Sequence, residues 1–152
     1  MKPEDLYHTG IVVDDFEAAL ARMADAAGYR WCEEAAVEQT VWTPAGDEKV
    51  RIRFAYSMSE PRVEVIEAVP GTVWTASDSG LHHLGYWSEA VDRDLDRLVA
   101  LGMEVEVKSV LPDGSSLFAY CRGVSGPRLE LVSRALEPMM TTWFATGRRP
   151  FA

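Results

Sequence analysis

The sequence predicts an α+β fold made of two tandem modules, each with the element order βαβββ. Two short strings of the first half recur in the second half in the same order. Residues 6–10 (LYHTG) correspond to residues 81–85 (LHHLG), and residues 61–66 (PRVEVI) correspond to residues 127–132 (PRLELV). In both halves the first string precedes a helical pattern, and the second reads as an apolar strand. Self-similarity of this kind indicates a duplicated supersecondary unit.

The first module, about residues 5–70, begins with a predicted strand over 7–13 and a predicted helix over 16–27. Asp14 or Asp15 can cap the start of the helix with a carboxylate, and Gly28 can end the helix in a left-handed conformation. Segments rich in β-branched and aromatic residues predict the remaining three strands of the module, which span 37–43, 50–56 and 62–68. Residues 29–33 also read as a strand, in addition to the βαβββ order.

The second module, about residues 80–134, repeats this order after a linker over 70–80. Its predicted elements are a strand over 81–87, a helix over 91–99, and strands over 103–110, 117–121 and 128–132. The histidine offset between the modules is 75 residues (83 minus 8), and the glutamate offset is 66 (130 minus 64). The difference of nine residues predicts a longer loop in the middle hairpin of the first module, since loops tolerate such changes.

Both modules together predict a single domain over residues 1–135, followed by a C-terminal amphipathic tail over 136–152. Apolar residues recur in the tail at helical spacing, namely Leu136, Met139, Met140, Trp143 and Phe144. Such a face can pack on the domain, close a cavity or dock on a second subunit. We favour packing or a partner surface, because apolar stripes on helices are usually buried.

Composition indicates an ordinary soluble globular protein, with 152 residues of which 47% are hydrophobic and 26% are charged. The net charge of -9 argues against binding to nucleic acid or to an anionic membrane surface. No segment resembles a targeting sequence or a membrane span, so we expect a cytoplasmic protein. The two cysteines, Cys32 and Cys121, are far apart in the chain, and we expect buried thiols rather than a disulfide.

Four polar residues lie within the apolar strings: His8, Glu64, His83 and Glu130. Side chains alternate along a strand, so each histidine shares a face with the glycine two residues later, and each glutamate faces away from its aliphatic neighbours. If that face is buried, each carboxylate needs a cation, a metal or a proton; if it is exposed, these are surface glutamates. Two imidazoles and two carboxylates form a mixed donor set suited to one divalent metal ion.

Other residues near these strings are weaker candidates. His82 and Glu67 could replace their neighbours as ligands, but their strand parity is opposite. Trp87 shares the predicted face of His83 and is predicted to line a substrate pocket. Further aromatic residues that could line a pocket or fill the core are Trp42, Trp74, Phe54, Phe118 and Tyr120. Three arginines could bind a carboxylate or phosphate or lie on a solvated strand face: Arg51, Arg53 and Arg62.

The sequence resembles the vicinal oxygen chelate superfamily, which includes glyoxalase I, methylmalonyl-CoA epimerase, extradiol dioxygenases, and fosfomycin and bleomycin resistance proteins. The resemblance covers nearly all of residues 6–133, and its motifs match residues 8–15, 63–67, 80–85 and 126–132. It implies that the tandem βαβββ modules form a half-open mixed β-barrel around one divalent metal ion. By the same resemblance, the metal ligands are His8, Glu64, His83 and Glu130.

The resemblance also implies a class of reaction. Extradiol dioxygenases use two histidines and one glutamate, so a fourth ligand favours the isomerase, epimerase and lyase branch. In that branch Glu64 and Glu130 would be catalytic, removing and returning a proton next to a carbonyl, with a metal-stabilised enediolate. We expect a partly apolar small molecule or thioester as substrate, and nickel, zinc, cobalt, manganese or iron as the metal.

Differences from particular family members narrow the range of expected substrates. Glyoxalase I usually carries an arginine and an asparagine for glutathione at the positions of Val12 and Ala68, so glutathione is not the expected substrate. Methylmalonyl-CoA epimerases usually carry glutamine at the position of Glu64.

Two alternative functions stay open: a ligand- or antibiotic-sequestering protein of the resistance type, whose members generally lack the metal ligands, and a ring-cleaving dioxygenase. Many members dimerise, so a homodimer is expected, with the barrel completed within one chain or by exchange between two.

Overall fold

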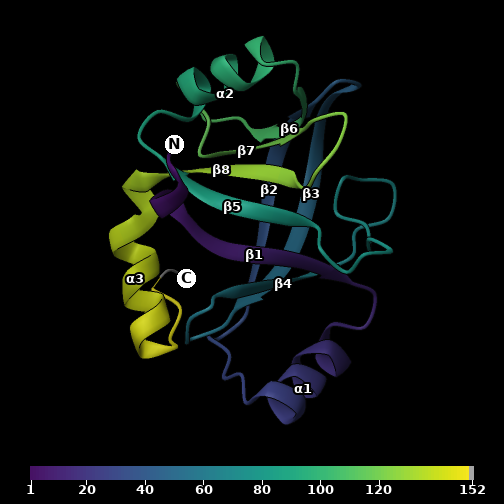
Figure 1. The fold of residues 1–152 in the computed structure, drawn as a ribbon, viewed down its shortest axis with the longest axis vertical. Helices are drawn as coiled ribbons and strands as arrows, with labels where there is room; N and C mark the ends of the chain where they lie inside the picture. Colours follow the sequence, from purple (N-terminus) through teal and green to yellow (C-terminus); the bar gives the residue numbers. More distant parts are fainter. Residues whose placement is uncertain (151–152) are drawn as a thin grey trace. The chain divides into compact units, whose positions relative to one another are not determined.

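The computed structural model describes residues 1–150 and shows an α+β fold in that part of the chain (Figure 1). The strands are β1 (Leu6–Val13), β2 (Ala35–Thr43), β3 (Gly46–Tyr56), β4 (Val63–Glu67), β5 (His83–Ser88), β6 (Glu104–Ser109), β7 (Phe118–Arg122) and β8 (Arg128–Ser133). The α-helices are α1 (Phe16–Ala27), α2 (Val91–Ala100) and α3 (Glu137–Thr146), and short 3-10 helices span Pro3–Asp5 and Arg134–Leu136. The last two residues of the predicted tail, Phe151 and Ala152, lie outside the described residues.

The strands are hydrogen-bonded in the order β1-β4-β3-β2-β6-β7-β8-β5, which is the order of a closed barrel. Strand β1 runs parallel to β4, and β5 runs parallel to β8. The pairs β3–β4, β6–β7, β7–β8 and β2–β6 are antiparallel. The mixed sheet and its repeated connectivity confirm the predicted fold class of tandem βαβββ modules.

One of two compact units contains His8–Val37, Arg51–His82 and the chain from Pro138, and we call it the His8 unit. Its helix α1 is capped by Asp15, whose Oδ1 accepts a hydrogen bond from the Ala18 amide at 3.0 Å, as the sequence predicts. Gly28 ends the helix at a φ of 73°. The buried side of α1 packs on aliphatic residues of the sheet, with Phe16, Ala19, Ala55 and Val65 at the centre of the cluster.

The other compact unit contains Met1–Tyr7, Glu38–Val50 and His83–Glu137, and we call it the His83 unit. Its helix α2 packs on the sheet through a second apolar cluster, whose buried members are Val91, Leu95, Leu98, Ala119, Cys121 and Leu131. Figure 1 shows α2 lying along β6, β7 and β8, as this cluster requires. Each module therefore covers one face of its strands with its own helix.

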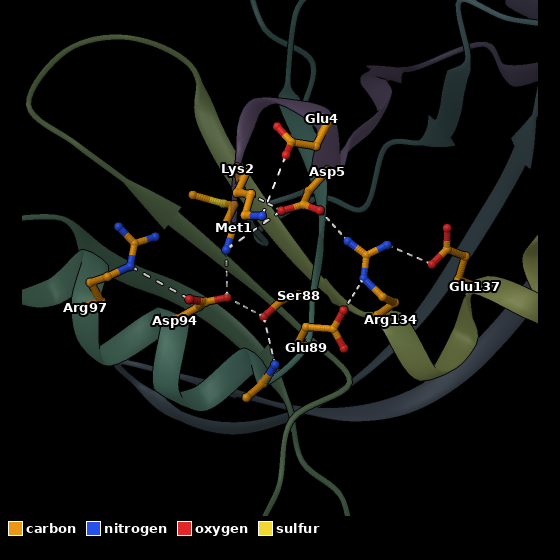
Figure 2. Close-up of polar contacts among 11 residues, drawn as sticks. Met1, Lys2, Glu4, Asp5, Ser88, Glu89, Asp94, Arg97, Arg134 and Glu137 are labelled. Carbon is orange, nitrogen blue, oxygen red and sulfur yellow. Dashed lines mark hydrogen bonds and ion pairs between the residues drawn. The ribbon is translucent and has the colours of Figure 1, made fainter.

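Ion pairs fix the chain where the second module leads into α3. Figure 2 shows Arg134 between three carboxylates, those of Asp5, Glu89 and Glu137. The Arg134 nitrogens lie 2.7 Å from Glu89 and 2.8 Å from Glu137. Nearby, the Ser88 hydroxyl donates to Asp94 at 2.7 Å. The guanidinium thus anchors the end of β8 to the residue that opens α3.

The predicted strand over 29–33 is wrong. Only Trp31 forms an isolated antiparallel bridge, with Ser57 as its partner. On either side of this bridge the Cys32 amide donates to the Tyr56 carbonyl and the Met58 amide to the Arg30 carbonyl, each at 2.8 Å. The pairing does not continue, because the Glu33 amide donates to the Gly147 carbonyl at 2.6 Å. The segment is thus limited to one bridge by a tertiary contact that local propensity does not contain.

The extra length of the first module lies in its strands rather than in the loop of its middle hairpin, so that prediction is also wrong. Strands β2 and β3 have 9 and 11 residues, whereas β6 and β7 have 6 and 5. The β2–β3 turn contains only Pro44 and Ala45, while the β6–β7 connection covers 110–117.

The C-terminal helix packs on its own unit, as the apolar stripe of the tail predicts. Met140, Trp143 and Phe144 are buried, and the Cys32 thiol lies 3.6 Å from the Trp143 carbonyl oxygen. None of the helices within residues 1–150 is long and apolar enough to cross a membrane.

The two cysteines are buried free thiols, which confirms the prediction from their spacing. Burial raises the pKa of the Cys121 thiol to about 11, with the Glu106 carboxylate adding to the effect. Burial also raises the pKa of the Cys32 thiol, although the charge of Arg62 opposes this. Neither thiol is therefore poised as a nucleophile.

The Cys121 pKa predicts a loss of stability in alkali. In the unfolded chain the thiol ionises near its ordinary pKa of 9.0, whereas in the folded protein it keeps its proton up to about 11. Between these values the folded state binds more protons, so the free energy of unfolding falls as pH rises, by about 2–3 kcal/mol for this group. Urea unfolding at pH 7.5 and 10.5 measures the loss, which should be smaller in Cys121→Ala. Equal losses in both proteins would contradict this origin.

Candidate metal centre

His8 and Glu64 form a buried pair on neighbouring parallel strands of the His8 unit. Strand register sets Gly10, two residues after the histidine, opposite Glu64. The imidazole Nε2 lies 3.4 Å from the Glu64 Oε2, and the side chains are 0% and 6% exposed. Gly10 therefore adds no side chain beside the Glu64 carboxylate.

His83 and Glu130 repeat this arrangement in the His83 unit. Here Gly85 lies opposite Glu130 on the parallel pair β5–β8. The distance from the His83 Nε2 to the Glu130 Oε2 is again 3.4 Å, and the side chains are 0% and 8% exposed. Two modules that differ in strand lengths and loops therefore keep the same His–Glu geometry.

Helices on the opposite faces of the strands explain why these polar residues point away from the aliphatic layers. Val65, next to Glu64, belongs to the cluster under α1, and Leu131, next to Glu130, belongs to the cluster under α2. Alternation then directs both glutamates to the other face of their strands. The reading in which they lie on a solvated surface is excluded by their burial.

Two tyrosines complete the repeated arrangement. Tyr56 lies opposite Glu64 on β3, and Tyr120 lies opposite Glu130 on β7. Each ring stands perpendicular to the neighbouring imidazole, at an interplanar angle of 87° for both pairs. Sequence reasoning missed Tyr56, although a signal was present: the tripeptide Phe-Ala-Tyr occurs at 54–56 and again at 118–120.

The alternative ligands have other roles. The His82 Nε2 lies 2.8 Å from the Val73 carbonyl oxygen, which ties this imidazole to the linker between the modules. Glu67 is half-buried and lies 3.5 Å from Arg53. Both positions agree with the opposite strand parity from which the sequence analysis disfavoured them.

Trp87 is buried on the same face of β5 as His83 and stacks on Tyr7, with ring centroids 3.8 Å apart. Its predicted role in a substrate pocket stays a prediction. Two of the three candidate arginines form ion pairs: Arg53 lies 2.7 Å from both Glu17 and Glu34, and Arg62 lies 2.6 Å from Glu60. These contacts favour the solvated strand face over the anion site, and they raise the pKa of Arg53 further above its usual range.

The donor chemistry of the two pairs fits a divalent metal ion. All four residues are buried, and each offers one ligand atom, an imidazole nitrogen or a carboxylate oxygen. Carboxylates with so little exposure need a compensating positive charge, and two of them balance a divalent ion. Mixed nitrogen and oxygen donors suit zinc, nickel, cobalt, manganese or iron.

The chain belongs to the glyoxalase/bleomycin resistance protein/dioxygenase superfamily, whose profile matches residues 7–120. This is the superfamily that the repeated motifs resemble. The matched region contains His8, Glu64 and His83 and ends before Glu130. No curated protein matches the sequence.

Solved structures with the same fold include several enzymes. A variant of Streptomyces coelicolor methylmalonyl-CoA epimerase in complex with 2-nitronate-propionyl-CoA aligns with a TM-score of 0.60 and 17% identity, over 86% of this chain and 97% of the epimerase. Mycobacterium tuberculosis methylmalonyl-CoA epimerase aligns with a TM-score of 0.54 and 17% identity, over 85% and 87%. A variant of Streptomyces coelicolor 4-hydroxymandelate synthase aligns with a TM-score of 0.55 and 21% identity, over 88% and 39%. At such identities the likeness concerns the fold alone.

Proposed function

We propose that the protein is a divalent-metal-dependent enzyme of the isomerase, epimerase and lyase branch of its superfamily. In this proposal His8, Glu64, His83 and Glu130 bind one metal ion between them. The observation that carries the proposal is the duplicated His–Glu pair, buried and spaced at 3.4 Å in both modules. A pair kept in both copies, through unequal strands and loops, favours a shared role over two independent structural contacts.

The glutamates have the chemistry of the acid and base that such a reaction needs. A bound divalent ion would act as a Lewis acid on the carbonyl oxygen of the substrate. In our proposal one glutamate removes the proton from the carbon next to that carbonyl, and the other returns a proton to the same carbon. The low exposure of both carboxylates excludes bulk water from competing for the proton.

The proposed substrate is an enolisable thioester or a related carbonyl compound with an apolar portion. Two observations support this class: the structurally similar epimerase was solved with an acyl-CoA analogue, and aromatic rings stand beside each pair. The homodimer and the cytoplasmic location expected from the sequence stay predictions.

Metal stoichiometry tests the shared centre. Metal-free protein is reconstituted with zinc or cobalt, desalted, and assayed by elemental mass spectrometry. We expect about one ion per chain in the wild type and almost none in His8→Ala or His83→Ala, because each variant removes one of four ligands. Thermal stability in the presence of metal should fall together with metal content. His82→Ala is the matched control, since His82 is a buried histidine outside the proposed ligand set, and it should keep the ion.

Other results have defined meanings. Two ions per chain, with one lost in each histidine variant, would assign a separate ion to each pair and contradict the shared centre. No metal in the reconstituted wild type would contradict metal dependence. The pairs would then be structural contacts of imidazole with carboxylate, and the sequestering alternative would lead.

A further inference from the structure

The repeated Phe-Ala-Tyr segments occupy the same place in both modules, and the proposed chemistry does not use them. Tyr56 and Tyr120 each lie opposite the glutamate of a His–Glu pair, on the strand antiparallel to it. Phe54 and Phe118 lie two residues earlier, on the same face. In each module, therefore, the glutamate strand has the tyrosine strand on one side. On its other side lies the strand that carries the histidine and its glycine.

The tyrosine rings contact the histidines in the same geometry. The ring centroids of His8 and Tyr56 are 5.4 Å apart, and those of His83 and Tyr120 are 5.0 Å apart, with an interplanar angle of 87° in both. Each tyrosine is also held by the preceding phenylalanine, at 5.9 Å in both modules. Perpendicular arrangements at these distances are favourable for aromatic pairs.

The opposite face of each segment fixes the direction of the tyrosine. Ala55 and Ala119 are fully buried in the clusters under α1 and α2, respectively. A rotation of either strand would pull its alanine out of a close-packed core, which is costly. Each tyrosine ring is therefore held in a fixed orientation beside its imidazole.

We propose that Tyr56 and Tyr120 are positioning residues that hold the His8 and His83 imidazoles with Nε2 directed at the glutamates. An imidazole can turn by half a rotation about its Cβ–Cγ bond, which exchanges the positions of its two edges. The perpendicular tyrosine ring resists this rotation. The role of the two tyrosines in metal binding rests on the proposed function, whereas their control of the imidazole orientation does not.

The C-terminal helix packs against one of these tyrosines within the His8 unit. Tyr56 contacts Trp143, with centroids 5.6 Å apart, and Phe144, with centroids 5.3 Å apart. The helix thus supports the ring that stands beside His8. A smaller residue at 143 should loosen His8 through Tyr56.

Ring-labelled histidine NMR on the metal-free protein tests the proposal. The chain has three histidines, so three ring signals are expected, and His82, tied to the Val73 carbonyl, serves as an internal reference. Tyr56→Leu should shift and broaden the His8 signal only, and Tyr120→Leu the His83 signal only. Tyr56→Phe and Tyr120→Phe keep the ring and should change the signals less than the leucine variants do. Trp143→Leu should reproduce a weaker form of the Tyr56→Leu spectrum.

Cobalt affinity supplies a second readout, measured by competition with a chelator well below the melting temperature. The leucine variants should bind Co²⁺ about three- to tenfold more weakly, the range of one aromatic pair, and the phenylalanine variants should match the wild type. Altered visible absorption of bound Co²⁺ in the leucine variants would report a displaced imidazole.

Three results would decide against positioning or separate it from the metal proposal. Unchanged histidine signals in both leucine variants would overturn it. A change of all three histidine signals in a single variant would also overturn it, because that pattern reports a general loosening of the fold. Selective NMR effects in a protein that binds no cobalt would uphold the positioning of the rings and reject the metal function.

Discussion

Replacing Glu64 or Glu130 by glutamine is expected to slow exchange of the proton next to the substrate carbonyl by roughly 10²–10⁴-fold, the usual contribution of a general base. Glutamine keeps the size of the side chain and can still accept a hydrogen bond, but its amide cannot take the proton. Exchange is followed by proton NMR in D₂O with a series of enolisable acyl-CoA thioesters. The double variant should show no exchange above the uncatalysed rate.

Glu67→Gln is the matched control for this experiment. Glu67 lies on the same strand as Glu64 but is half-buried and faces Arg53, so its replacement should leave the exchange rate unchanged. If neither Glu64→Gln nor Glu130→Gln slows an exchange that the wild type catalyses, both lose their proposed role as base. A wild type that binds the thioester without exchanging its proton would favour the sequestering function.

Trp143→Ala is expected to lower the free energy of unfolding by about 3–5 kcal/mol, the usual cost of removing a large buried aromatic side chain. Trp143 has no exposed surface, and its ring meets those of Phe54 and Tyr56 at 6.0 and 5.6 Å. Its removal leaves a cavity that a packed helix and sheet fill only in part. Urea unfolding of the metal-free protein at neutral pH measures the change.

Trp42→Ala shows whether the effect belongs to the site rather than to the residue type. Trp42 is only partly buried, and its ring lies 5.9 Å from the Lys108 ammonium, so its loss opens no sealed cavity. We expect a clearly smaller destabilisation than for Trp143→Ala. Equal effects would mean that α3 contributes no more to stability than a surface hairpin does.

Strand periodicity and the repeated strings were sufficient to predict much of the fold and to select His8, Glu64, His83 and Glu130, although not the pairing of each histidine with the glutamate of its module. In β1 the alternation of His8, Gly10 and Val12 with more exposed neighbours appears directly in the burial pattern. Strand β4 is different, because Glu64, Val65 and Ile66 are all buried, so burial alone could not have separated its two faces. Strand parity still predicted correctly which face of β4 carries Glu64, because the alternation of side chains depends on backbone geometry and not on the surroundings.

The failures come from contacts between distant segments. The pairing of residues 30–32 with the chain at 56–58 ends where the Glu33 amide bonds to the Gly147 carbonyl, which lies far away in sequence. The role of Tyr56 was missed for a different reason: aromatic residues are common in strands, and only register shows that this one lies opposite Glu64. The repeated tripeptide indicates that Tyr56 and Tyr120 are equivalent residues of the two modules. Only the pairing between strands shows which residues they lie opposite.

The unequal middle hairpins have a consequence for how this scaffold can change. Register with β1 and β5 fixes each glutamate, while the hairpin strands differ between the modules by several residues. Growth or loss of hairpin residues therefore leaves the histidine–glutamate spacing intact. Natural variation, or a protein engineer, can therefore change the hairpin of one module without moving the proposed metal ligands of either module.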